Sequence, residues 1–239
     1  MELLLLSNSM NFGEEMFSHA KRAFVEVAAG DVVTFIPYAL ADWDDYADRA
    51  IRAMGAFGIE VVSAHRSSAP DRAIAEADVV MMGGGNTFRL LDSLYLLDVL
   101  DELGARVRSG ATRYMGASAG TNVACPTIRT TNDMPIVQPP DFTAFNLVPF
   151  QINPHYIDPP PPEARVGETR EERLREFLEE NDVVVIALRE QSWLEIDGPS
   201  MRLVGTGGAV LFRRGAETEQ VTGGADLSAL LLDTPRYDA

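Results

Sequence analysis

Short apolar runs alternate with amphipathic segments from the beginning of the chain. The strands predicted from apolar runs are 3–6, 32–36, 59–64, 79–82 and 113–117. The helices predicted from apolar residues three and four apart are 16–27, 43–54, and one or two helices over 88–107. Continuous apolar strands separated by helices predict an α/β fold, with a parallel sheet flanked by helices on both faces. We therefore expect functional groups at the carboxyl ends of the strands.

The pattern changes after residue 125. Between Pro126 and Pro162 both periodicities are lost, and the four consecutive prolines at 159–162 cannot be helical. We predict a loop here, much of it lying over the functional edge of the sheet.

Periodicity returns at Thr169, which forms a capping box with Glu172 and predicts a helix to about Glu180. An apolar strand follows at 182–188. From about 193 to 222, turn dipeptides separate short apolar runs, which predicts antiparallel hairpins added to the parallel sheet. Because we find no internal repeat, we expect one domain over residues 1–239.

Composition narrows the class of protein. The 239 residues are 46% hydrophobic and 23% charged, which is ordinary globular usage. A net charge of −16, from 20 Lys and Arg against 36 Asp and Glu, would repel phosphate backbones, so we expect no nucleic-acid partner. Cys125 is the single cysteine, so no intrachain disulfide can form. The chain lacks a signal-like start and an apolar stretch of membrane length, so we expect a cytoplasmic protein without a membrane partner.

A candidate nucleophile lies where the strand at 113–117 ends. Residues 116–120 match G-x-S-x-G, and the motif needs this strand-to-helix context to lift a serine Oγ out of the sheet. The alternative is a glycine-rich turn in which Ser118 merely caps a helix. Other residues must decide between the two.

A serine nucleophile usually needs a base, and the chain has three histidines. His19 lies in a predicted helix and His65 ends a strand beside an arginine, which is typical of structural or solvated positions. His155 follows a short apolar run and a proline, and it is our candidate base. No histidine follows it, which disfavours the chain order of α/β-hydrolases. Four carboxylates could orient His155, namely Asp133, Asp141, Asp158 and Glu190, of which Glu190 alone directly follows a buried-type strand.

Two further features fit acyl transfer to an acidic substrate. The glycine turn at 83–85 could offer the N–H of Gly84 or Gly85, which would form an oxyanion hole together with the N–H of Ala119. The alternative, a phosphate-binding P-loop, is weaker because the turn lacks the Lys-Ser/Thr of that motif. Arg170 would occupy the first helical position, where the helix dipole disfavours a cation. Such an arginine could bind a carboxylate, or it could simply pair with Glu171 or Glu176 on the surface.

Taken together, these residues resemble the S51 family of serine peptidases, to which α-aspartyl dipeptidases belong. The likeness covers most of the chain, and its matching strings are 1–9, 83–88, 116–120, 125–137, 151–155 and 167–171. The resemblance implies a flavodoxin-like fold of the kind found in class I glutamine amidotransferases. It also implies a cofactor-free and metal-free exopeptidase that releases N-terminal aspartate from Asp-X dipeptides.

By matching position, the resemblance makes Ser118 the nucleophile, His155 the general base and Glu190 its orienting acid. It further implies that Arg170 pairs with the substrate aspartate and that Asp133 belongs to the site.

Two departures from the family pattern bear on specificity, since many relatives carry Trp where this chain has Ala117 and Pro where it has Arg189. The alternatives are a cyanophycinase-like hydrolase of another acidic peptide or polymer, and a non-catalytic protein that binds acidic ligands. A homodimer is compatible with the sequence.

Overall fold

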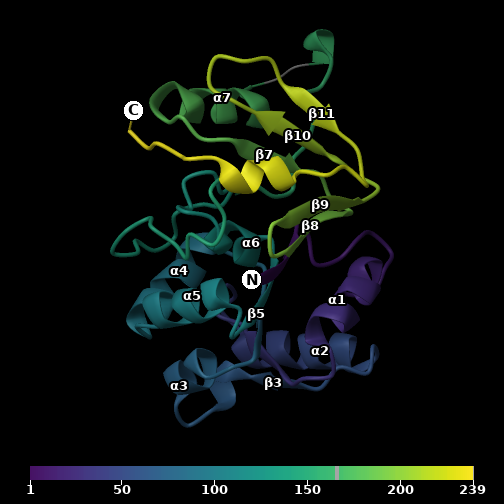
Figure 1. Cartoon of the computed structure of the whole chain (residues 1–239), viewed down its shortest axis with the longest axis vertical. Coiled ribbons are helices and arrows are strands. Elements are labelled where there is room, and N and C mark those ends of the chain that lie inside the picture. Colours follow the sequence, from purple (N-terminus) through teal and green to yellow (C-terminus); the bar gives the residue numbers. More distant parts are fainter. Residues whose placement is uncertain (165–166, 239) are drawn as a thin grey trace.

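The computed structural model describes residues 1–164 and 167–238, and its centre is a seven-stranded sheet (Figure 1). The strand order is β3-β2-β4-β5-β1-β8-β9. The bounds of these strands are β1 Glu2–Leu6, β2 Val33–Ile36, β3 Val61–Ser63, β4 Val79–Met82, β5 Arg113–Ala117, β8 Ser192–Asp197 and β9 Ser200–Gly205. The first five pair in parallel, whereas β8 and β9 add an antiparallel hairpin beside β1.

The parallel part follows the flavodoxin order from its second strand onward. Counted from β2, the order of β3, β2, β4 and β5 is 2-1-3-4, and β1 takes the place of the fifth strand. β1 therefore lies between β5, whose end carries the G-x-S-x-G turn, and the C-terminal hairpin. The predicted parallel sheet with antiparallel C-terminal hairpins is confirmed.

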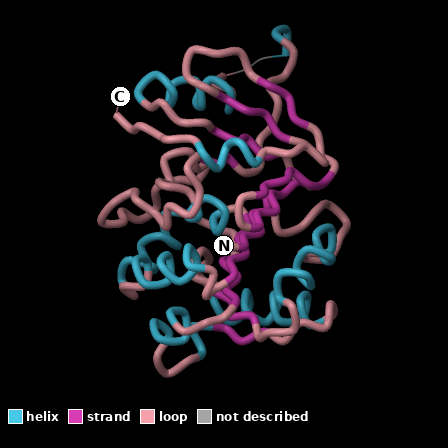
Figure 2. Tube along the Cα trace, viewed as in Figure 1, coloured by secondary structure: helices cyan, strands magenta, loops and turns pink. Residues whose placement is uncertain are grey.

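Helices cover both faces of this sheet, as the cyan coils on either side of the strands show in Figure 2. Helices α1 (Lys21–Ala28) and α2 (Trp43–Gly55) pack on one face, and α3 (Pro70–Ala75), α4 (Thr87–Leu96), α5 (Leu100–Ser109) and α6 (Ala119–Ala124) on the other. The 3-10 helices are η1 Ser18–Ala20, η2 Ala64–Arg66, η3 Pro162–Ala164 and η4 Ser228–Leu232. Strand β1 shows why this sandwich forms, because Leu3 and Leu5 enter one apolar cluster while Leu4 and Leu6 enter the other.

A second sheet of four strands lies above the first in Figure 1, in the order β11-β10-β7-β6. Its strands are β6 Gln151–Asn153, β7 Val185–Leu188, β10 Ala209–Phe212 and β11 Glu219–Val221. Helix α7 (Arg170–Glu180) packs on its outer face through Leu174 and Leu178, and the inner face joins the main core through Ile152, Ile186 and Leu188. The apolar pattern predicted the strand before Glu190 but not its place in a separate sheet.

The prediction of a loop throughout 126–162 was wrong at β6, whose three residues are too few to show a period. The remaining differences from expectation are local. The predicted helical stretch at 88–107 is two helices separated near Asp98, which has a left-handed φ of 55°. Helix α3 was not expected, because six residues are too few for a clear apolar period.

The predicted capping box is confirmed, since Thr169 Oγ1 accepts from the N–H of Glu172 at 3.2 Å and the Glu172 carboxylate accepts from the N–H of Thr169 at 2.7 Å. Within residues 1–164 and 167–238 no helix is long and apolar enough to span a membrane. The single-domain boundary stays a prediction.

Candidate active site

Ser118 lies on the turn between β5 and α6, in a backbone conformation that serine rarely adopts. Its φ is 52° and its ψ is −105°. The flanking glycines make the turn possible, because a β-carbon at Gly116 would lie 2.6 Å from the Gly120 carbonyl oxygen and one at Gly120 would overlap the Met82 carbonyl. Ala119 is the first residue of α6, so its N–H has no acceptor within the helix. The strand, the strained serine and the first turn of α6 together form a sharp elbow.

His155 and Glu190 meet this serine in one hydrogen-bonded chain. His155 Nε2 lies 2.8 Å from Ser118 Oγ, and His155 Nδ1 lies 2.9 Å from Glu190 Oε1. Glu190 follows β7 and His155 follows β6, so the second sheet supplies both partners of a serine from the first. The side chains remain accessible, with exposed fractions of 35% for His155 and 57% for Glu190. Of the four candidate acids, Glu190 is the one that contacts His155.

The glycine turn at 83–85 follows β4 and lies against the elbow. A β-carbon at Gly84 would be 3.3 Å from the Ser118 β-carbon, and one at Gly85, whose φ is 136°, would be 2.6 Å from the Ala39 carbonyl oxygen. Burial raises the pKa of Tyr46 to about 12, and a hydrogen bond with the Gly84 backbone opposes that rise. The missing side chains of Gly84 and Gly85 therefore let this turn pack directly against the elbow and the Ala39 backbone.

Asp133 lies in the loop after α6, and its carboxylate contacts the first residue of α4, outside the hydrogen-bonded chain of Ser118, His155 and Glu190. Its Oδ2 accepts from the Thr87 N–H at 2.7 Å, from Thr87 Oγ1 at 2.6 Å and from Thr131 Oγ1 at 3.1 Å. The amide of Asn122 connects Thr87 to the Ser118 carbonyl, at 3.4 Å from each oxygen. A helix N-terminus and two hydroxyls thus hold an anionic group beside the nucleophile turn.

Arg170 lies at the start of α7, as predicted, and it lines a pocket of about 600 Å³ together with His155, Arg189 and Glu190. Nη1 of Arg170 is buried and has no hydrogen-bond partner among the described residues. Burial lowers the pKa of the guanidinium, as does the nearby Arg173, whereas Glu190 opposes the change. Such a cation is partly desolvated without being neutralised, which suits it to an anionic ligand.

Arg189, one of the two departures noted in the sequence, pairs with residues other than His155 and Glu190. Its Nε and Nη2 donate to the two carboxylate oxygens of Asp158 at 2.7 and 2.6 Å, and Nη2 also donates to Gln220 at 2.6 Å. The bidentate pair fastens the segment that precedes the four prolines to the end of β7. Of the two arginines in the pocket, Arg170 is therefore the one with an unpaired donor.

The other residues considered from sequence lie away from this chain. His65 contacts Ser63 and Asp44, and His19 packs against Trp193 with both ring nitrogens buried. Asp141 accepts from Thr143 in the loop after α6. The described residues contain no group of three His, Cys, Asp or Glu side chains that could hold a metal ion.

Sequence reasoning missed two buried polar residues directly after β1, Ser7 and Asn8. Ser7 Oγ accepts from the His155 N–H at 2.9 Å, and Asn8 Oδ1 accepts from the Gln191 N–H at 3.0 Å. Their position at the carboxyl end of a central parallel strand was the available signal.

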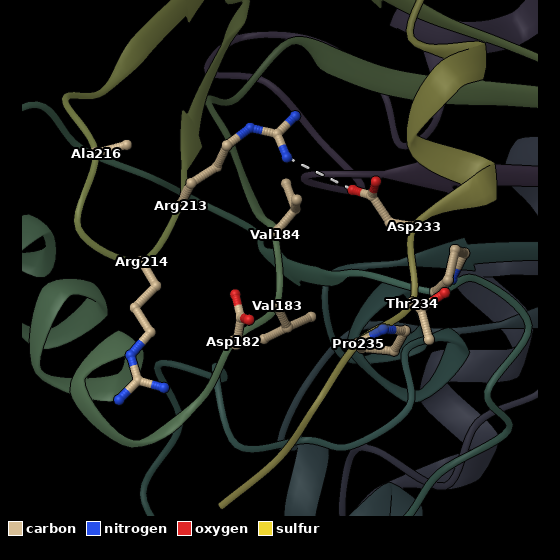
Figure 3. Close-up of a pocket in the computed structure, with 10 residues that line it drawn as sticks. Asp182, Val183, Val184, Arg213, Arg214, Ala216, Asp233, Thr234 and Pro235 are labelled. Carbon is tan, nitrogen blue, oxygen red and sulfur yellow. Dashed lines mark ion pairs between the residues drawn. The ribbon is translucent and has the colours of Figure 1, made fainter. Parts of the chain in front are cut away.

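A separate pocket of about 340 Å³ lies at the opposite end of β7 (Figure 3). Arg213 points across it toward Asp233, with Nη1 of the arginine 3.6 Å from the carboxylate. Asp182, which lines the same pocket, is paired with Arg236. This pocket has no serine, cysteine or histidine in its lining and lies far along the strand from Glu190, so it is not the candidate site.

Comparisons with known proteins identify the family and support the fold. The family model described as Peptidase family S51 matches residues 3–204. Peptidase E of Streptomyces coelicolor is 53% identical over 232 residues, which cover 97% of this chain and 95% of that protein. A probable alpha-aspartyl dipeptidase of Drosophila melanogaster is 42% identical over 96% of this chain and 97% of its own length. Among solved structures, a putative peptidase E protein from Listeria monocytogenes superposes with a TM-score of 0.64 at 23% identity, over 85% of this chain and 98% of that one, which supports the fold.

Proposed function

The chain belongs to peptidase family S51, as its motifs predicted, and from this premise we propose that it is a serine exopeptidase that hydrolyses Asp-X dipeptides. The observation that carries the proposal is the hydrogen-bonded chain from Ser118 through His155 to Glu190. Relatives named Peptidase E and probable alpha-aspartyl dipeptidase, at 53% and 42% identity, support the choice of substrate.

In the first half of the reaction, Ser118 Oγ attacks the carbonyl carbon of the aspartyl residue while His155 Nε2 accepts the hydroxyl proton. Glu190 accepts from Nδ1–H, which keeps Nε2 free to act as the base and stabilises the imidazolium that forms. The tetrahedral intermediate then collapses, the amine of residue X leaves with the proton from His155, and an aspartyl ester remains on Ser118. In the second half, water attacks this ester with His155 again as the base, and free aspartate is released.

The oxyanion needs donors placed beforehand, and each is typically worth about 10²–10³ in kcat. We assign one to the N–H of Ala119, at the beginning of α6. The glycine turn supplies the second. That donor is the N–H of Gly84 or of Gly85, and the missing side chain of Gly84 allows the turn to approach Ser118.

Aspartate selectivity requires a local cation, because a protein of net charge −16 repels acidic peptides at long range. We assign this role to Arg170, whose buried Nη1 lacks a partner among the described residues. The positive α-ammonium of the substrate needs the opposite charge, and Asp133 is the carboxylate on the nucleophile side of the site. Salt screens charges that lie more than about 8–10 Å away. The two direct contacts therefore affect substrate binding more than the distant surface charge does.

The test is release of free aspartate from Asp-Leu, compared with Asn-Leu, Glu-Leu and Ala-Leu, for the wild type and for Ser118→Ala. We expect hydrolysis of Asp-Leu in strong preference to the other three, and its loss in the variant. Hydrolysis of an acidic polymer in place of all four dipeptides would indicate a cyanophycinase-like enzyme. A folded wild type that binds Asp-Leu without releasing aspartate would indicate a binding protein.

A further inference from the structure

We infer that Ser7 and Asn8 are positioning residues for the proposed triad, Ser7 for His155 and Asn8 for Glu190. The inference rests on the proposed function, because it assumes that Ser118, His155 and Glu190 act together. It assigns a catalytic purpose to the end of β1, which carries none of the reacting groups.

The end of β1 contacts the segment of each triad residue through three consecutive positions. The carbonyl of Leu6 accepts from the Ser118 N–H at 3.1 Å and from Thr121 Oγ1 at 2.6 Å, which fixes both sides of the nucleophile turn. Ser7 and Asn8 then reach the two segments that come from the other sheet. One short stretch of chain therefore sets the spacing between the serine on the first sheet and its partners on the second.

Ser7 is fully buried, and both hydrogen-bonding roles of its hydroxyl are used. Oγ donates to the Leu188 carbonyl at 3.0 Å and accepts from the His155 N–H at 2.9 Å. The Tyr156 N–H donates to the same Leu188 carbonyl at 2.9 Å. His155 has a left-handed φ of 53°, a conformation that persists in a non-glycine residue only where its surroundings hold it. The Ser7 hydroxyl is a direct contact that holds it.

Asn8 holds the backbone next to Glu190, the proposed acid. Its side chain is 1% exposed, and Oδ1 accepts from the N–H of Gln191, which directly follows Glu190 and has a left-handed φ of 66°. The amide is itself fixed, since Nδ2 donates to Asn11 Oδ1 at 2.7 Å and to the Met10 carbonyl at 2.9 Å. Glu190 has a largely exposed side chain, so the backbone on either side of it must determine where its carboxylate lies.

The energetic reason is that catalytic geometry tolerates little error. A displacement of about 1 Å in a reacting group can cost about 10²-fold in rate. The contacts of Ser118 with His155 and of His155 with Glu190 are 2.8 and 2.9 Å, and within residues 1–164 and 167–238 neither His155 nor Glu190 makes another side-chain hydrogen bond. Loss of the Ser7 or Asn8 hydrogen bond would therefore slow the reaction by displacing His155 or Glu190, without removing the Arg170 guanidinium from the pocket.

The test uses Ser7→Ala and Asn8→Ala, with Ser192→Ala as the matched control. Ser192 is also fully buried, its carbonyl accepts from the Ser7 N–H at 3.0 Å, and its own hydroxyl has no partner among the described residues. We expect kcat on Asp-Leu to fall about 10- to 100-fold in the first two variants, with KM within about threefold of wild type. Ser192→Ala should keep the wild-type kcat. Thermal unfolding of each variant shows whether it is folded, and Asn8→Ala carries the test if Ser7→Ala does not fold.

A second measurement separates this inference from the choice of substrate. The Ser118-dependent hydrolysis of p-nitrophenyl acetate needs the serine and its base but no aspartyl group. In a Ser7→Ala, His155→Ala double variant we expect no loss beyond that of His155→Ala alone, because a positioning residue acts through the residue it positions. The wild type could hydrolyse the ester but not Asp-Leu, with a lower rate of ester hydrolysis in Ser7→Ala. That result would support the inference and refute the proposed substrate. Wild-type kcat in folded Ser7→Ala and Asn8→Ala, or losses additive with His155→Ala, would overturn the inference, as would a wild type inactive on both substrates.

Discussion

Replacement of Arg170 by alanine should reduce the activity on aspartyl dipeptides while leaving the fold intact. Breaking a desolvated charge pair costs about 2–5 kcal/mol. Arg170 is only partly buried, so we take the lower part of that range, about 2–3 kcal/mol, which corresponds to a loss of about 30- to 150-fold in kcat/KM. An uncharged analogue such as Asn-Leu cannot form the pair, so its rate should change much less.

The free energy of unfolding should not fall in Arg170→Ala. A cation in the first turn of a helix is unfavourable by about 0.3–1 kcal/mol, and Arg170 is the first residue of α7. Its neighbour Arg173 adds a like charge that lowers the pKa of the Arg170 guanidinium further. Arg170→Ala should therefore keep or slightly raise the free energy of unfolding, so that lost activity cannot be attributed to lost structure.

The assay is the ratio of kcat/KM for Asp-Leu to that for Asn-Leu, with denaturant unfolding of the same preparations. Arg173→Ala is the control, since it removes an arginine from the same turn whose partner is the exposed Glu168. The control should keep the wild-type ratio. An unchanged ratio in Arg170→Ala would refute the assignment of Arg170 as the carboxylate receptor, whatever the absolute rates.

Three other perturbations follow from features of the fold. Gly120→Ala should lower the free energy of unfolding by about 1–3 kcal/mol, because the added methyl would overlap backbone, whereas Gly55→Ala, with open space, should not; equal unfolding midpoints would refute this. Thr169→Ala should cost about 1 kcal/mol through loss of the capping box, and an unchanged thermal midpoint would contradict it. Burial raises the pKa of the Cys125 thiol to about 12, so it should stay protonated and unreactive toward Ellman's reagent at about pH 8 until the protein is unfolded; rapid labelling of the native protein would show otherwise.

The sequence predicted those parts of the molecule that local patterns determine. The continuous apolar run at 79–82 could only be a buried strand, and the structure has β4 at the same four residues. Glu190 was favoured because it follows a buried-type strand, and the structure places it in contact with His155 although the strand belongs to another sheet. An apolar run has the same appearance in either sheet, because the partners of a strand are fixed by contacts distant in sequence.

The same limit explains why the residues around the site were missed. Ser7 bonds to Leu188 and His155, which are far away along the chain, and nothing near Ser7 in the sequence indicates that contact. Asn122 and Thr87 lie in short polar stretches that occur in many helices, and they gain meaning only when α4 and α6 pack together. In contrast, the position of Arg170 at the start of a helix was predictable from the capping box, and its conflict with the helix dipole made it a candidate.

Because the site is divided between two sheets, activity requires that the two sheets are packed together. Ser118 follows a strand of the seven-stranded sheet, and His155 and Glu190 follow strands of the four-stranded one. If each sheet kept its secondary structure but the two sheets separated, the circular dichroism spectrum would be nearly native. The molecule would nevertheless be inactive. Hydrolysis should therefore vanish at lower denaturant than helicity does, and a partly folded chain leaving the ribosome would remain unable to cleave peptides until the last strands have docked.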